Sequence, residues 1–380
     1  MLTPFDDYPV HQTSAPIAES GNGHPDFYDR FWFNGYVDDT YFAVALGIYP
    51  NRGIIDAAFS VVSDGVQRSV FASGRAPMDR TVTAIGPIRI EIIEPLRTSR
   101  IVVDAAEYDL CADLTFHART PAYEEPRQTR VQGVRLLTDM TRASQLGTWT
   151  GSLVAGARSC VFTPAHAPYG TKDRSWGIRP VGLPAPSAPS PAAGQIFFLW
   201  APLNFADTAV HYMTFEDAHG SSWAKTGVVL PVLSADDAVC GPGTRATQVD
   251  IEHDITWLPG LRRAKRASLF IKDDGSGKYG GTVELEPLLT FRMKGAGYFH
   301  PHWAHGCWHD ELAVGGECTP VDDLDNVALE NIHVQQVVRA RWGERIGFGV
   351  LEQLVIGPHS PSGFTGIADG ARPNAHATSH

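Results

Sequence analysis

The stretch Tyr108-Asp-Leu-Cys-Ala-Asp-Leu-Thr-Phe-His117 decides the fold class. Its apolar residues recur at every second position, as Leu110, Ala112, Leu114 and Phe116. A period of two is typical of a β-strand with one buried face. The same alternation runs through residues 249–257, where the second face is acidic or polar. Both segments therefore predict half-buried strands.

Most of the remaining chain also favours β structure. Further candidate strands are residues 41–49, 54–62, 88–93, 195–200, 209–215, 267–271, 282–293, 332–340 and 346–356. The 37 glycines and 27 prolines interrupt the chain at short intervals, which disfavours long helices. The best helical periodicity, at 327–342, is rich in β-branched residues and still favours a strand. We predict an all-β protein with few short helices, built as antiparallel barrels or sandwiches.

The domain organisation follows from length and one change in composition. The 380 residues have room for two β-barrels. Residues 182–194 form a run rich in Pro, Ala and Ser, which can neither pair in a sheet nor pack in a core. We predict an N-terminal β-barrel domain at 1–181, a linker at 182–194, and a C-terminal β-barrel domain at 195–380 with a flexible tail from about residue 369.

Charge and hydropathy exclude several classes of partner. The formal net charge of −11 opposes binding to phosphate backbones, so no nucleic acid partner is expected. No stretch approaches the roughly 18 apolar residues that would cross a bilayer, and the start MLTPFDDYPVHQ lacks the features of a signal peptide. The five widely spaced cysteines are typical of reduced thiols. We therefore expect a cytoplasmic protein without membrane insertion.

The segment 169–179 carries the first candidate site residues, Asp173, Arg174, Trp176 and Arg179. In an extended conformation, Arg174 and Trp176 lie on one face and Asp173 lies on the other. A cation beside an indole can bind a planar or anionic group, and a desolvated aspartate can act as a general acid. The alternative is a structural Asp/Arg pair with a core tryptophan, which composition alone favours.

The segment 298–310 holds four histidines and one cysteine within ten residues. It contains neither HExxH nor CxxC, and Pro301 and Gly306 break any helix that would align metal ligands. We therefore predict no bound metal and interpret the segment as a turn that lines a pocket. His300 and His305 are its candidate acid–base groups, and Trp303 is a candidate for substrate binding.

Two C-terminal strands add further candidates. In residues 209–217, Tyr212 and Glu216 share one face, where they could activate or protonate a substrate, and His211 lies on the other face. A glutamate at a strand end is more often simply solvated. Glu352 interrupts an apolar run, so its carboxylate must face water, a partner or a ligand. Standard nucleotide-binding and esterase motifs are absent, so nucleotide-dependent reactions and standard esterase mechanisms are not expected.

Residues 172–179 (KDRSWGIR), 297–306 (GYFHPHWAHG) and 349–357 (GVLEQLVIG) together resemble the carotenoid 1,2-hydratase (hydroxyneurosporene synthase) and AttH-like family. The resemblance extends from about residue 26 to 363. It implies two tandem lipocalin-like β-barrels, a pocket near their junction that needs no cofactor, and acid–base chemistry on apolar substrates. Hydratases, cyclases and pericyclase-like enzymes share this architecture.

One position departs from the family's Asp-His-x-Trp-Gly element. Asp173, Trp176 and Gly177 match it, but Arg174 replaces the histidine. An arginine is a very poor proton donor at neutral pH and a good partner for an oxyanion. The departure argues against hydration of a carotenoid and favours a more oxygenated substrate.

These inferences lead to two hypotheses of different classes. The first is a cofactor-independent lyase, of the hydratase or dehydratase type or a related C–O or C–C cleaving type, for an apolar aromatic or isoprenoid-like small molecule. The second is a non-catalytic carrier of a hydrophobic small molecule, and a cyclase or isomerase remains open on the same fold. Convergence of Asp173, Arg174, Tyr212, His300 and His305 on one cavity would favour an enzyme. A homodimer is compatible with either hypothesis.

Overall fold

The computed structural model describes residues 7–9, 14, 23–77, 79–184, 188, 194–272 and 279–371. The chain divides into two compact units. Unit 1 contains Met1–Pro186, Leu230–Ala246 and Lys294–Asp323, and unit 2 contains Ser187–Val229, Thr247–Met293 and Leu324–His380. Each unit is built on one antiparallel sheet, and the described residues form only short 3₁₀ turns besides strands. The prediction of an all-β protein with few short helices is confirmed.

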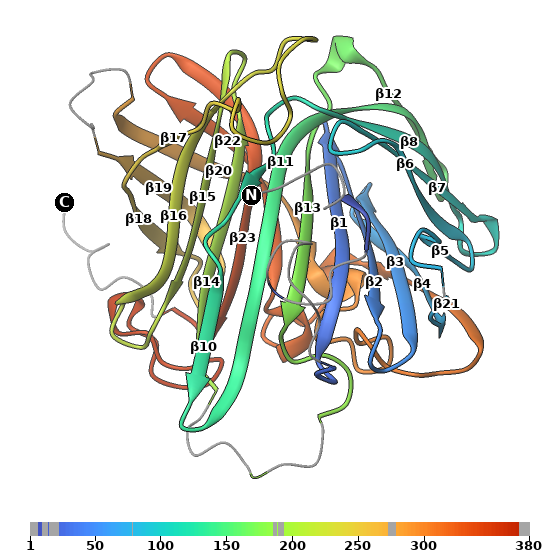
Figure 1. Ribbon diagram of the computed structural model, residues 1–380. Coiled ribbons are helices and arrows are strands. Elements are labelled where there is room, and N and C mark those ends of the chain that lie inside the picture. Colours follow the sequence, from blue (N-terminus) through green and yellow to red (C-terminus); the bar gives the residue numbers. More distant parts are fainter. Residues whose placement is uncertain are drawn as a thin grey trace. The chain divides into compact units, whose positions relative to one another are not determined.

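Unit 1 is a nearly closed barrel (Figure 1). Its strands are β1 (Phe27–Val37), β2 (Thr40–Tyr49), β3 (Ile54–Ser63), β4 (Val66–Arg75), β5 (Ala84–Ile85), β6 (Ile88–Glu94), β7 (Thr98–Ala105), β8 (Leu110–Ala118), β9 (Tyr123–Glu124), β10 (Gln128–Gln132), β11 (Arg135–Ala155), β12 (Arg158–Phe162), β13 (Tyr169–Ile178) and β21 (Leu312–Pro320). The sheet order is β21-β4-β3-β2-β1-β13-β11-β8-β7-β6-β5. The 3₁₀ turns η2 (Ala106–Tyr108), η3 (Pro164–His166) and η5 (Val321–Asp323) lie between strands.

The barrel core uses one face of each strand. Phe31 and Phe33 of β1 pack with Phe42 of β2, Phe116 of β8 and Trp149 of β11 in one buried cluster. Because side chains alternate along a strand, the residues between these positions lie on the opposite face, which we call the outer face. The alternation that predicted the strand at 108–117 is the alternation of β8 in this core.

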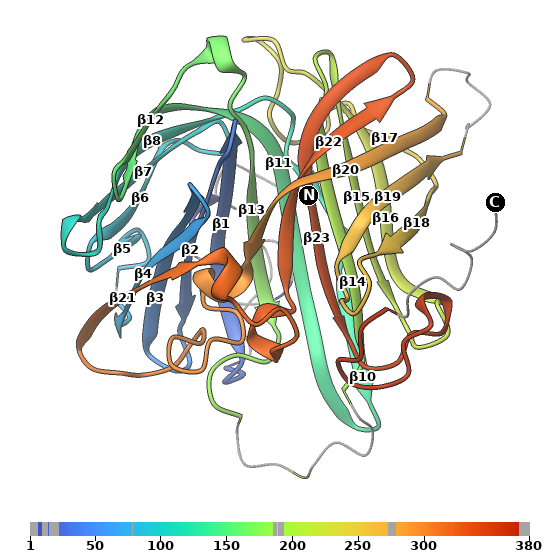
Figure 2. The ribbon, with the colours of Figure 1, turned by 180° about the vertical axis from the view of Figure 1, so that it is seen from behind.

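Unit 1 also receives chain from beyond the predicted linker. Strand β21 pairs with β4 along its length, from Leu312 opposite Gly74 to Pro320 opposite Val66 (Figure 2). The segment Lys294–Asp323 thus belongs to unit 1, whereas the sequence assigned it to a contiguous domain at 195–380. Most of the predicted linker, residues 185–187 and 189–193, and the end of the predicted tail, residues 372–380, lie outside the described residues.

Unit 2 is a half-barrel whose sheet order is β17-β16-β15-β14-β23-β22-β20-β19-β18. Its strands are β14 (Ile196–Asn204), β15 (Thr208–Glu216), β16 (Ser222–Pro231), β17 (Thr247–Gln248), β18 (Ile251–Trp257), β19 (Ala264–Ile271), β20 (Gly281–Arg292), β22 (Val334–Trp342) and β23 (Arg345–Ile356). The 3₁₀ turns are η4 (Met293–Ala296), at the boundary of the units, η6 (Leu329–Asn331) and η7 (Ser360–Ser362). No described segment forms a helix that is long and apolar enough to span a membrane.

Candidate functional site

The outer face of unit 1 carries polar residues in the middle of its strands. Arg30 and Trp32 lie there because their neighbours Phe31 and Phe33 fill the barrel core. Gly47 of β2 stands opposite Arg30 on one side and opposite Asp56 of β3 on the other. A Cβ at Gly47 would lie 2.5 Å from the Tyr49 hydroxyl. The glycine therefore leaves room for these polar side chains to occupy the same row of the sheet.

The predicted histidine-rich turn covers this face. His300 Nδ1 accepts the backbone N–H groups of His302 and Trp303, at 3.0 and 2.8 Å, and His300 Nε2 donates to Glu317 Oε1 at 2.9 Å. The Trp303 ring stacks on Phe71 of β4 with a centroid distance of 5.7 Å. Both ring nitrogens of His300 are used to fix the turn, and this presents Trp303 to the sheet.

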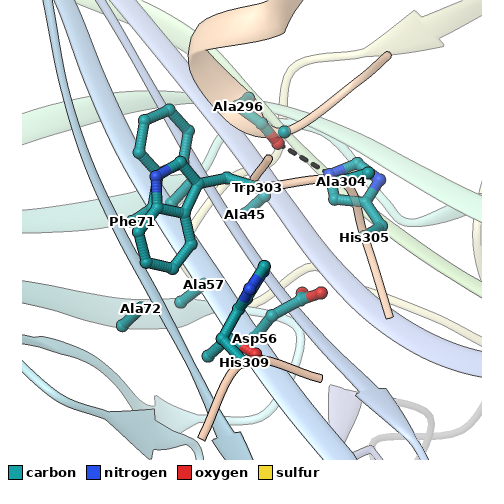
Figure 3. Close-up of a pocket in the computed structure, with 13 residues that line it drawn as sticks. Ala45, Asp56, Ala57, Phe71, Ala72, Ala296, Trp303, Ala304, His305 and His309 are labelled. Atoms are coloured by element: carbon teal, nitrogen blue, oxygen red, sulfur yellow. Dashed lines mark hydrogen bonds between the residues drawn. The ribbon is translucent and has the colours of Figure 1, made fainter. Parts of the chain in front are cut away.

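A small pocket lies between the turn and strands β2, β3 and β4 (Figure 3). Its walls are alanines of the strands and the turn, the rings of Phe71 and Trp303, and the side chains of Asp56, His305 and His309. Its free volume is about 10 Å³, roughly the space that one water needs. The pocket as it stands therefore admits a water molecule, and a larger molecule requires its walls to move.

Asp56 is the ionisable group with the most unusual environment in this pocket. The Tyr49 hydroxyl donates to Oδ1 at 3.1 Å, and the Gly306 backbone N–H donates to Oδ2 at 2.6 Å. Burial raises the pKa of Asp56 from 3.8 to about 6, although the Gly306 hydrogen bond and the charges of Arg30 and Arg179 oppose this shift. A carboxyl group with a pKa near the working pH can both give and take a proton.

The two histidines of the pocket are constrained in different ways. His305 Nε2 donates to the Ala296 carbonyl at 2.7 Å, which fixes its tautomer. Burial lowers the pKa of His309, and the nearby His302 lowers it further. Burial also raises the pKa of Tyr49 well above its usual range, so that Tyr49 remains a hydrogen-bond donor to Asp56.

The candidate residues of the segment 169–179 lie on both faces of strand β13, as the period of two predicts. Asp173 lies opposite Trp32 on the outer face and pairs with Arg142 at 3.0 Å. Arg179 also belongs to this region, with its guanidinium 4.6 Å from the Tyr28 ring and 5.7 Å from the Tyr298 ring.

Arg174 and Trp176 point to the other side of β13, and both are almost fully buried. Arg174 Nη2 donates to Asp29 Oδ1 at 2.6 Å, and its guanidinium lies 3.8 Å from the Phe31 ring centroid. Trp176 packs with Ala143 of β11. Asp173 and Arg174 therefore do not face the same space.

Tyr212 and Glu216 lie together in unit 2, on one face of β15. The Tyr212 hydroxyl is 2.8 Å from His253 Nδ1, which lies 3.7 Å from Glu216 Oε1. The other oxygen of Glu216 is 3.1 Å from His359 Nε2. Burial lowers the pKa of His253, while burial and the charge of Glu216 raise the pKa of Tyr212. These four side chains form one hydrogen-bonded and electrostatic network.

His211 and Glu352 lie on the opposite face of the same sheet. The His211 ring contacts Trp200 edge to face at 5.8 Å. Glu352 lies opposite Trp200 and Gln335 in the ladders, and it accepts hydrogen bonds from His333 Nε2 and Gln335 Nε2, each at 2.6 Å. Glu352 thus has partners inside the protein, as its position in an apolar run requires. The five proposed catalytic residues therefore do not converge on one cavity, since Tyr212 lies in unit 2 and Asp173 and Arg174 face opposite sides of β13.

Sequence reasoning did not select Asp56, Tyr49 or Arg30. A signal for Asp56 exists, since it is the one carboxylate in the apolar run at 54–62, which is the argument that selected Glu352. Arg30 and Tyr49 carry no comparable signal. Their importance arises from residues 294–306, which come from a distant part of the chain.

A metal prediction follows from the same geometry. In the described part of the chain, no three His, Cys, Asp or Glu side chains gather as a ligand set. We expect the purified protein to hold less than about 0.2 equivalents of zinc, iron or copper, and chelators to leave its activity unchanged. Elemental analysis before and after dialysis against EDTA checks this, and stoichiometric metal would contradict it.

Comparison with solved structures confirms the predicted resemblance to AttH-like proteins at the level of the fold. A candidate AttH (NE1406) from Nitrosomonas europaea has 14% sequence identity and a TM-score of 0.50, with 91% of this chain and 98% of that chain covered. CghA has 11% identity and a TM-score of 0.48, with 91% and 92% covered. CghA with Sch210972 has 12% identity and a TM-score of 0.45, with 91% and 93% covered.

Sequence comparison places the chain in a family that has no assigned activity. No curated protein matches the sequence. A family model described as a family of unknown function (DUF8625) matches residues 2–365, which is nearly the whole chain. The chain therefore belongs to the family of unknown function DUF8625.

Proposed function

We propose that this protein is a cofactor-independent lyase that adds water to, or removes it from, an apolar aromatic or isoprenoid-like small molecule. Asp56 is the proton-transferring group in this proposal. The observation that carries it is a carboxyl group whose pKa is raised to about 6 and which borders a pocket walled by aromatic rings and alanines. Structural carboxylates are usually paired with a cation, which lowers their pKa instead.

The proposed reaction uses Asp56 in both directions. In dehydration, the Asp56 carboxylate removes a proton from the carbon next to a C–OH carbon. The C–H electrons form the C=C bond, and the hydroxyl leaves as water after receiving the same proton back from the acid form of Asp56. Hydration is the reverse. The free volume beside Asp56 fits the one water that either direction involves.

The walls of the pocket favour an apolar substrate over a sugar or a nucleotide. Phe71 and Trp303 stack with an interplanar angle of 4°, and the remaining walls are mostly alanine. An aromatic substrate could stack on Phe71 in place of the Trp303 ring, since parallel aromatic packing is favourable. Binding then requires the turn that carries Trp303 to shift.

The test is detection of a product. The protein is incubated with panels of aromatic and terpenoid alkenes and alcohols, and mass spectrometry follows each compound. We expect a change equal to the mass of one water with the native protein and none with Asp56→Asn. Recovery of unchanged ligand in the bound fraction would favour a carrier, and a product of equal mass would favour a cyclase or isomerase.

A further inference from the structure

Three buried hydrogen-bond donors gather around one tyrosine ring on the outer face of unit 1. They are Nη2 of Arg30, Nε1 of Trp32 and Nε of Arg179, and none of them has a hydrogen-bond partner among the described residues. The Arg30 and Arg179 guanidinium carbons lie 4.6 and 5.7 Å from the centre of the Tyr298 ring, and the Trp32 ring lies 6.2 Å from it. Buried donors without acceptors are rare and costly, so this group requires an explanation.

The charges nearby do not supply an acceptor. Arg30 is only 2% exposed, and its Nη1 donates to the Tyr298 hydroxyl oxygen at 2.7 Å. Both arginines act electrostatically on Asp56, but the Asp56 oxygens accept hydrogen bonds from Tyr49 and Gly306. A buried guanidinium without an anionic partner is strongly unfavourable.

Neighbouring arginines differ from Arg30 and Arg179 in that each has a carboxylate as an ion-pair partner. Arg142 pairs with Asp173 at 3.0 Å and with Glu125 at 3.3 Å, so these two carboxylates already have a cation beside them. Arg52 pairs with Asp26 at 2.8 Å. Among the described residues, Arg30 and Arg179 form no ion pair. The outer face of unit 1 therefore has two cations and an indole N–H available for an anion.

We propose that Arg30, Arg179 and Trp32 form a receptor for a substrate carboxylate, which narrows the substrate of the proposed lyase to an aromatic or isoprenoid carboxylic acid. The guanidinium groups would donate to the carboxylate oxygens, and arginine is well suited to this planar group. The Trp32 and Tyr298 rings would flank its apolar part. This inference rests on the proposed function only for the identification of the ligand as a substrate.

The sheet also sets the distance between the receptor and Asp56. Arg30 and Asp56 lie on β1 and β3, and Gly47 of β2 is register partner to both. Two strand spacings separate their backbones by about 10 Å. A molecule of a few carbon atoms could therefore hold its carboxylate at Arg30 while a carbon beyond it reaches Asp56.

Calorimetric titration of the native protein with sodium cinnamate and sodium acetate tests the receptor, with cinnamamide as the neutral comparison and sodium chloride to hold ionic strength constant. We expect saturable binding of both carboxylates, tighter for cinnamate, and at least about 10-fold weaker binding of the amide. Failure of either carboxylate to bind, or equal binding of cinnamate and cinnamamide, would overturn the proposal. Acetate is small enough to enter any site built for a carboxylate.

Variants locate the binding site. Arg30→Gln should weaken cinnamate binding by about 10- to 100-fold. Trp32→Phe, which keeps an apolar aromatic ring but removes the N–H and part of the ring volume, should weaken it by about 10-fold. Arg158→Gln, at a partly exposed arginine of β12, should leave the affinity unchanged. If Arg30→Gln fails to fold, the milder Trp32→Phe variant still tests the site. Unchanged affinity in Trp32→Phe would overturn the assignment of these donors.

Asp56→Asn separates this inference from the proposed function. It removes a negative charge near the arginines, so cinnamate should bind at least as tightly as to the native protein. Tight binding with full activity in Asp56→Asn would refute the acid–base role and leave the receptor standing. Loss of activity in Asp56→Asn, together with no carboxylate binding by the native protein, would refute the receptor and leave the acid–base role standing.

Discussion

Asp56→Asn is expected to slow turnover by about 10²- to 10⁴-fold, the usual contribution of a general acid or base, without destabilising the protein at pH 8. The asparagine can keep both hydrogen bonds of the carboxyl group. Its Oδ1 can accept from the Gly306 N–H, and its Nδ2 can donate to the Tyr49 oxygen, which now donates to Asp56. Activity should therefore fall for a chemical reason and not because the pocket collapses.

The stability of the same variant has a defined pH dependence. Because the pKa of Asp56 is raised from 3.8 to about 6, the folded protein binds more protons than the unfolded chain between these values. The Asp56 contribution to stability is thus fully present below pH 3.8 and is lost as pH rises through 6. Asp56→Asn avoids this loss, so its melting temperature should exceed that of the native protein most clearly above pH 6.

Thermal melts between pH 4 and 8, with turnover measured on the same samples, check both expectations. Asp104→Asn, at an exposed aspartate of β7, is the matched control and should change neither quantity. An Asp56→Asn protein that is fully active removes this residue from the mechanism. The opposite result would be an inactive Asp56→Asn variant whose melting temperature, compared with that of the native protein, is lower at pH 8 than at pH 4. That result would show that Asp56 has a structural role.

Many strands of this protein, most completely those of unit 2, are readable from sequence, because alternation depends only on neighbouring residues. The predicted segments at 41–49, 54–62 and 346–356 correspond to β2, β3 and β23. The segment at 327–342 contains β22, as its β-branched residues predicted despite some helical periodicity. The predicted segments do not include β1, β4, β7, β11 or β16. They also omit β21, since Leu312–Pro320 has two adjacent glycines and few apolar residues. Its pairing with β4 makes this segment a strand, although its own residues do not favour one.

The candidate site is less predictable for the same reason. The motif at 298–310 was correctly selected as unusual, but its partners Arg30, Asp56 and Phe71 lie more than 220 residues earlier in the chain. Nothing local in β1 or β3 indicates that a distant turn will cover their outer face. The period of two did separate Asp173 from Arg174, and this separation decides what each residue can do.

Arg174 is expected to contribute mainly to stability, and its replacement should produce the largest loss of folding free energy among the residues discussed. The side chain is 1% exposed and pairs with the equally buried Asp29. Arg174→Met keeps much of the apolar volume but leaves the Asp29 carboxylate without its cation. Breaking a buried ion pair in this way costs about 3–5 kcal/mol, because the remaining charge is buried and uncompensated.

A double-mutant cycle with Asp29→Asn distinguishes this structural role from the oxyanion-binding role that the sequence predicts for Arg174. If the pair is structural, the double variant should unfold at a higher urea concentration than Arg174→Met alone, since no unpaired charge remains. Residual turnover in each variant should then follow the folded fraction.

Arg174 Nε and Nη1 have no hydrogen-bond partner among the described residues, so a substrate oxygen could still use them. In that case Arg174→Lys would remain folded and lose turnover, because a point ammonium cannot reproduce the planar guanidinium. The two roles therefore predict opposite relations between stability and turnover in the same variants.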